Sequence, residues 1–149
     1  MKKLADWIIG VMTRKPPDFI IGGYENPYLY RWRLLPHNPL FNLYVHCIVR
    51  ADDDRALHDH PWFWGSYIFK GSYFEITDKG RKRYDAGSFR IHSPWFRHRL
   101  EPIDSHVWTL FFLWFKMRSW GFWCPQGFVH WKKFVASDDK GSVGKGCDQ

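Results

Sequence analysis

Two histidines separated by a single residue, His58 and His60, have the types and the spacing that could do metal chemistry. In a β-strand, residues i and i+2 point to the same side, so both imidazoles can face one ion while Asp59 points away. Neutral imidazole is the commonest protein ligand for a metal ion. A later strand that carries His98 could cross the first strand, and His98 would then supply a third nitrogen. Three nitrogens leave positions open, as a catalytic metal requires.

The alternative for this pair is structural, because His58 and His60 could be ordinary loop histidines paired with nearby aspartates. An acidic run, residues 52–54, lies just before them and lacks the spacing of a calcium loop. It is best interpreted as a solvated connector or as a partner for Arg55.

The elements that must position the histidines are predicted mainly as strands, because short apolar or alternating runs are separated by turn residues. Turns are expected at Gly71, at Asp78-Lys79-Gly80 and at Gly87. The expected strands cover residues 41–50, 63–69, 73–77, 81–84, 88–92 and 107–115, followed by a strand pair within 121–131 that is broken at Pro125 and Gly127. Many short strands at fairly regular spacing predict an all-β sandwich or barrel.

The run 41–50 shows the clearest alternation of side chains. One face would carry Leu43, Val45, Cys47 and Val49, and the other Tyr44, His46, Ile48 and Arg50. His46 could therefore line the interior of the fold, although a structural role for it is the simpler interpretation.

A short amphipathic helix is predicted at the N-terminus, within a unit of residues 1–15 that ends at Pro16-Pro17. Its apolar face, at spacing i, i+3, i+4 and i+7, consists of Leu4, Trp7, Ile8 and Val11. It would dock on the barrel or on a second copy in a homodimer, and association with a membrane surface is the lesser alternative. The apolar run is far shorter than the roughly 20 residues that span a bilayer. The barrel would occupy residues 16–136, and residues 137–149 would form a flexible tail.

The net charge and the cysteines indicate the class of binding partner and the cellular compartment. The 149 residues carry 22 Lys and Arg against 15 Asp and Glu, a net charge of +7 that favours anionic partners. We expect a small anionic molecule rather than nucleic acid, because no nucleic-acid motif is visible. The three widely spaced cysteines, Cys47, Cys124 and Cys147, form no CxxC pair and predict a cytoplasmic protein without a disulfide framework.

The segment from 58 to 98 resembles the two consecutive motifs of the cupin superfamily. His58, His60 and Gly71 match the first motif, and Gly87, Pro94 and His98 match the second. The glutamate of the first motif would fall near Trp64 or Gly65, and neither side chain can bind a metal. The resemblance therefore implies a three-histidine site, as in thiol-dioxygenase-like cupins, inside an RmlC-like jelly-roll β-barrel.

A closer resemblance covers residues 16–134. The stretch Ala56-Leu57-His58-Asp59-His60-Pro61-Trp62 and the C-terminal Trp120-Gly121-Phe122 are similar to signatures of small cupin-like proteins of phage and bacterial genomes. This resemblance implies the fold and says little about the reaction, because one fold serves many activities.

Four residues are candidates for binding an anionic or aromatic ligand: Arg55, Arg90, His92 and Trp95. Arg90 and His92 share one face of a strand, opposite Phe89 and Ile91. If that face is inward, the planar guanidinium of Arg90 could clamp a carboxylate or phosphate. The alternatives are a solvated strand face for Arg90 and aromatic packing for Trp95. His130 is expected to be structural.

Two functional hypotheses follow. In the first, His58, His60 and His98 hold a divalent ion, Fe(II) before Zn, Ni or Mn, in a dioxygenase-like oxidoreductase that acts on a small anionic substrate. In the second, the barrel binds or sequesters a small anionic ligand, such as a signalling nucleotide, without catalysis.

Overall fold

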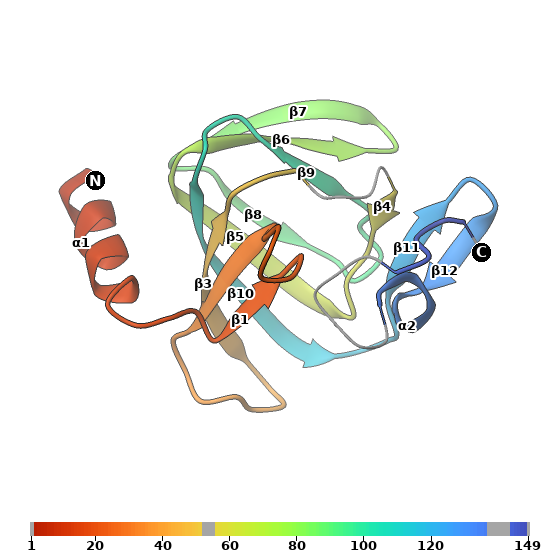
Figure 1. Ribbon diagram of the computed structural model, residues 1–149, viewed down its shortest axis with the longest axis horizontal. Coiled ribbons are helices and arrows are strands. Elements are labelled where there is room, and N and C mark those ends of the chain that lie inside the picture. The colour runs from red at the N-terminus through yellow and green to blue at the C-terminus, as the bar shows by residue number, and fades with distance from the viewer. Residues whose placement is uncertain (1, 52–55, 137–143, 149) are drawn as a thin grey trace.

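The protein is described by a computed structural model that covers residues 2–51, 56–136 and 144–148. Figure 1 shows β-strands in the centre of the molecule, α1 at one end, and the β11–β12 hairpin with α2 at the other. The elements are α1 Lys2–Met12, β1 Phe19–Ile21, β2 Leu29–Arg33, β3 Asn42–Ile48, β4 Leu57–His58, β5 Trp62–Lys70, β6 Ser72–Thr77, β7 Gly80–Asp85, β8 Phe89–His92, β9 Arg99–Pro102, β10 Val107–Lys116, β11 Gly121–Cys124, β12 Gly127–His130 and α2 Trp131–Phe134.

All the strand pairs are antiparallel, and they form three sheets. The largest has the order β1-β2-β3-β10-β5-β8, and two smaller sheets have the orders β12-β11-β4 and β7-β6-β9. An isolated bridge between His58 and His98 joins the two smaller sheets. Among the described residues, the hydrogen bonds between strands do not continue from sheet to sheet into one closed ring. The predicted all-β fold with an N-terminal helix is confirmed, and its jelly roll consists of open sheets rather than a closed barrel.

Strand β3 shows why the alternation in this region is informative. Val45 and Cys47 pack with Met12 of α1 on one side of the sheet. Tyr44 and His46 point to the other side, where Tyr44 packs with Trp64 and His46 lines a cavity. Both faces of β3 are therefore covered, and the interior face carries the polar side chains that matter for the site.

The predicted packing face of the N-terminal helix is wrong in part. Leu4 is 62% exposed and Trp7 is 66% exposed, whereas Ala5 and Met12 are buried. The helix rests on the sheet through Met12 and the half-buried Ile8, Ile9 and Val11. Ile8 and Val11 were therefore predicted correctly, whereas Leu4 and Trp7 do not belong to the contact face. A second, short helix, α2, follows β12 and was not expected from the sequence.

The prediction that the cysteines stay unpaired is also wrong. Cys124 at the end of β11 and Cys147 form a disulfide, and only Cys47 is a free thiol among the described residues. Gly144 N donates to the carbonyl of Phe134, so residues 144–148 of the predicted tail return to the fold, while 137–143 lie outside the described residues. The disulfide removes the argument for a cytoplasmic location that was drawn from unpaired cysteines. The cytoplasmic location and the homodimer both stay predictions.

No helix in the described part of the chain has the length and apolar character needed to span a membrane.

Candidate metal centre

His58 and His98 lie directly opposite each other on two neighbouring strands. The backbone N–H of His58 donates to the carbonyl of His98 at 2.9 Å, and the N–H of His98 donates back at 3.0 Å. Residues paired in this way project their side chains to the same face. Their rings accordingly lie 4.9 Å apart, centroid to centroid. The backbone register thus brings together two histidines that are 40 positions apart in sequence.

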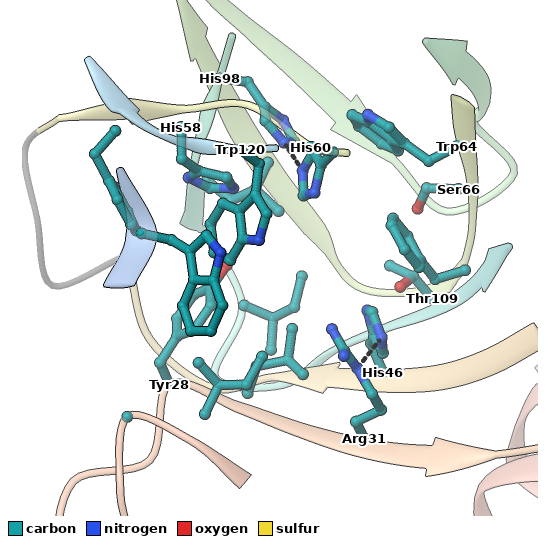
Figure 2. A pocket seen from close by; sticks show the side chains of 18 of the residues that line it. Tyr28, Arg31, His46, His58, His60, Trp64, Ser66, His98, Thr109 and Trp120 are labelled. Carbon is teal, nitrogen blue, oxygen red and sulfur yellow. Dashed lines mark hydrogen bonds between the residues drawn. The ribbon is translucent and has the colours of Figure 1, made fainter. Parts of the chain in front are cut away.

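His60 completes the cluster from the first strand. Its Nε2 lies 2.9 Å from Nε2 of His98, and one nitrogen from each of the three histidines lies within 4.8 Å of the other two. Figure 2 shows the three imidazoles gathered at one end of a cavity. The predicted triad His58, His60 and His98 therefore converges as the spacing and the cupin resemblance had indicated.

Asp59 anchors the strand between the two histidines. Its side chain points to the opposite side and is completely buried. The carboxylate accepts hydrogen bonds from Arg118 Nη1 at 2.7 Å, from the backbone N–H of Gly121 at 3.0 Å and from Trp123 Nε1 at 3.0 Å. Three donors on one carboxylate fix this residue against β11 and so restrict where the flanking imidazoles can lie.

Glu75 orients the third histidine, and the sequence analysis did not find it. The Nδ1 of His98 lies 2.7 Å from Oε1 of Glu75, and both side chains are buried. If Nδ1 carries the proton and donates it to the carboxylate, Nε2 is left with a lone pair facing His60. A carboxylate behind a histidine is a frequent support for metal ligands because it fixes the tautomer and the ring orientation.

Burial keeps the imidazoles of His60 and His98 neutral. Burial, reinforced by the other histidines, holds the pKa of His60 and that of His98 well below the ordinary value of 6.5. Burial raises the pKa of Glu75 to about 7 and lowers that of Arg90 to about 10. Arg90 remains a cation at neutral pH, and its ion pair with Glu75 favours the ionised carboxylate. Neutral imidazoles are the form that can bind a metal ion.

Trp64 and Gly65, which stand where the cupin motif has a glutamate, are packed against neighbouring side chains. Trp64 is buried, and its ring lies 4.9 Å from that of His60 and 4.8 Å from that of His98. A side chain at Gly65 would meet the ring of Phe112 and the backbone of Arg90. The described residues around the triad therefore offer three nitrogen ligands. This donor set fits a divalent ion such as Fe(II) or Zn(II).

The triad opens onto a cavity of about 390 Å³ between the sheets, within the size range of small-molecule sites. Its walls are mostly apolar and aromatic. Among the described residues that line it there are two arginines, Arg31 and Arg90, and no carboxylate. The two cations and the absence of a lining acid in this part of the chain favour an anionic ligand.

The four predicted ligand-binding residues have different positions. Arg90 lines the cavity, and the inward direction of its strand face agrees with the exposure of Phe89 and Ile91 on the other face. His92 is half-buried, stacks on Phe96 at 3.7 Å, and lies outside the cavity lining. The side chain of Trp95 is 59% exposed and also lies outside it. Arg55 lies outside the described residues.

Two other histidines were expected to be structural. His130 caps α2, because its Nδ1 accepts from the backbone N–H of Lys132. His46 is buried and lines the cavity, and its Nε2 accepts a hydrogen bond of 2.9 Å from Arg31 Nε. Arg31 itself was missed by the sequence analysis, since no pattern around residues 29–33 had been assigned to a strand.

Solved structures share this fold at low sequence identity, whereas no family model and no curated protein matches the sequence. The Fe(II) form of HppE superposes with a TM-score of 0.57 and 12% identity over 69% of this chain and 58% of the other. An RmlC-like cupin from Shewanella frigidimarina gives 0.52 and 18% over 67% and 82%. The EutQ protein of Clostridium difficile gives 0.52 and 11% over 67% and 79%. The match to HppE thus spans little more than half of that protein. On this evidence the chain has an RmlC-like cupin fold.

Proposed function

We propose that this protein binds one divalent metal ion through His58, His60 and His98 and uses it on a small anionic molecule. The observation that carries the proposal is the convergence of three imidazoles, with Glu75 behind His98, at one end of a cavity. Structural histidines in a core do not need a buried carboxylate that turns one ring nitrogen toward two other rings. Such an arrangement is typical of metal ligands.

The finer proposal is a dioxygenase-like oxidoreductase with Fe(II), and Zn, Ni or Mn as alternatives. A bound ion would supply Lewis-acid or redox chemistry at the positions that the three nitrogens leave open. The chain's own residues would orient the ion and hold the substrate in a largely apolar space. The fold is shared with HppE, which is described in an Fe(II) form.

Elemental analysis of the purified protein tests the proposal. We expect near-stoichiometric metal in the wild type after mild purification or reconstitution, and a loss of most of it in His58→Ala. His106→Ala is the matched control, because His106 is exposed, lies outside the cavity lining, and its Nδ1 lies 3.2 Å from the hydroxyl of its neighbour Ser105. Absence of metal from the reconstituted wild type, or equal metal in His58→Ala, would contradict the proposal.

A second candidate is a metal-dependent or metal-free binder that does not turn its ligand over. It is favoured by one observation, namely that the described lining of the cavity holds no carboxylate that could serve as a general acid or base. Native mass spectrometry of the purified protein, followed by analysis of what heat releases, separates the two candidates. An unaltered ligand after incubation supports the binder, and a changed one supports the enzyme.

A further inference from the structure

A row of polar side chains crosses the inner face of the large sheet, away from the histidine triad. Arg31 on β2 is opposite His46 on β3, and His46 is opposite Thr109 on β10. Ser66 on β5 is opposite Phe111, the next residue of β10 on the same face, and is therefore diagonal to Thr109. All four line the cavity, and Figure 2 shows them on one wall of it. Neighbouring strands therefore place a cation, an imidazole and a hydroxyl side by side, with a second hydroxyl diagonal to the first.

Arg31 is the unbalanced charge in this row. Its Nε donates to Nε2 of His46 at 2.9 Å, and its guanidinium lies 5.1 Å above the ring of Tyr44. Within residues 2–51, 56–136 and 144–148, no carboxylate lies within ion-pair distance of it. The other cavity arginine, Arg90, is different, because it forms an ion pair with the buried Glu75. Arg31 is half-buried on β2, and a partly desolvated cation without a counter-charge is costly. Burial accordingly lowers the pKa of Arg31 below its usual value.

The groups around Arg31 can complete an anion site. Ser66 and Thr109 are buried and line the cavity, and their hydroxyl groups make no hydrogen bond to another residue of the described chain. A hydroxyl can donate to an anion as soon as one arrives. Because Nε2 of His46 accepts from Arg31, the ring proton of neutral His46 is on Nδ1. His46 thus holds Nε of Arg31, while the terminal nitrogens stay available for the two oxygens of a carboxylate or phosphate.

The row lies close to the triad. The ring of Phe111 stacks on that of His46 at 4.8 Å and also contacts the ring of His60 at 6.2 Å. One aromatic ring therefore separates the two polar ends of the cavity, and the walls between them are apolar. A ligand that reaches both ends must be small, with an oxyanion at one end and a metal-binding group at the other.

We propose that Arg31, oriented by His46 and assisted by the hydroxyls of Thr109 and Ser66, binds the carboxylate or phosphate end of the ligand. The statement that the other end of this ligand reaches the ion rests on the proposed function; the anion site itself does not. Arg90, which the sequence had suggested for this role, serves Glu75 instead. Arg31 is then the residue that selects anionic over neutral ligands.

The test measures binding of acetate and of inorganic phosphate to the full-length protein by isothermal titration calorimetry, in a buffer without other oxyanions. We expect saturable one-to-one binding of at least one anion to the wild type, and the stronger of the two names the class. Arg31→Gln should weaken it about tenfold or more, the loss expected for a hydrogen bond to a charged partner. Arg33→Gln, an exposed arginine on the same strand, is the matched control and should change it less than about twofold, since exposed charges are screened.

Thr109→Val keeps the shape of the side chain and leaves Arg31 in place, so it tests the site even if Arg31→Gln fails to fold. We expect it to weaken anion binding several-fold. Metal content is measured on every sample. Anion binding that depends on Arg31 in a protein without metal would support this inference while refuting the proposed function. No saturable binding to the wild type, equal binding by Arg31→Gln, or an equal loss in Arg33→Gln would overturn the inference.

Discussion

His98 Nδ1 and Glu75 Oε1 lie 2.7 Å apart in the interior of the fold, between β6 and the start of β9. This contact determines which nitrogen of His98 is available to the triad. It also ties the triad to Arg90, which forms an ion pair with the same carboxylate and contacts the hydroxyl of Tyr73. The metal centre and the arginine on β8 are therefore one connected network.

Glu75→Gln is expected to weaken metal affinity by about 10- to 100-fold, the usual loss when a residue behind a metal ligand is changed. Glutamine keeps the shape and can still accept from His98, but it removes the negative charge that favours the imidazole as a ligand. Affinity is measured by competition with a chromophoric chelator. Glu101→Gln is the control, because Glu101 forms only partly exposed ion pairs with Arg81 and Arg99. An unchanged metal affinity in Glu75→Gln would show that Glu75 does not support the metal ligands.

Asp59→Ala is expected to lower the free energy of unfolding by about 3 kcal/mol or more, because it leaves Arg118 and two N–H donors without their buried acceptor. Urea denaturation followed by circular dichroism measures the change. Asp85→Ala removes an exposed partner of Arg83 and should cost less than about 1 kcal/mol. Similar values for the two variants would show that Asp59 does not anchor the strand between the histidines.

Replacing a glycine by alanine should lower the stability of the protein at Gly121 and raise it at Gly10. A Cβ at Gly121 would lie 2.2 Å from the carbonyl oxygen of Val129 on β12, so Gly121→Ala must separate two paired strands and should destabilise the protein. A Cβ at Gly10 would meet nothing within 4 Å, and Gly10→Ala should stabilise α1 by about 0.5–1 kcal/mol. Thermal unfolding midpoints of both variants decide the matter. A neutral Gly121→Ala would contradict the strand pairing that supports Asp59.

Thiol counting tests the cysteine arrangement. Cys47 is buried, and burial raises the pKa of its thiol to about 12, so the thiolate that reacts is scarce near neutral pH. Mass spectrometry after alkylation should find no modified cysteine in the native protein. It should find one after denaturation without reductant and three after denaturation with reductant. Three modified cysteines without reductant would show that Cys124 and Cys147 are not paired.

Much of the site could be predicted from the sequence because its signals are local. The i, i+2 spacing of His58 and His60 sends both rings to one side, and alternation places Arg90 and His92 on the inner face of β8. Turn residues such as Gly80 and Gly87, both with positive φ, mark where the strands reverse. The cupin resemblance supplied His98, which no local pattern would have connected to His58.

The remaining features depend on contacts between distant segments. Glu75 is the single charged residue of β6 and Arg31 is one of two arginines in β2, and only the strand order shows that both face the interior. Residues 144–148 return to the end of α2, where Gly144 donates to Phe134, and this brings Cys147 to Cys124; the spacing of the cysteines does not reveal it. The helix stripe was misplaced in part because α1 packs on the sheet through Ile8, Ile9, Val11 and Met12, while Leu4 and Trp7, nearer its N-terminus, stay exposed.

X-ray absorption at the edge of the bound metal tests the central claim most directly. After reconstitution with Fe(II) or Zn(II), the account predicts three imidazole nitrogens at about 2.0–2.2 Å, with any further ligands being light atoms from water or a bound small molecule. His98→Ala should lose one of these imidazoles or the ion itself. A spectrum without imidazole scattering, a sulfur ligand, or a wild-type protein that retains no ion would contradict a three-histidine metal centre.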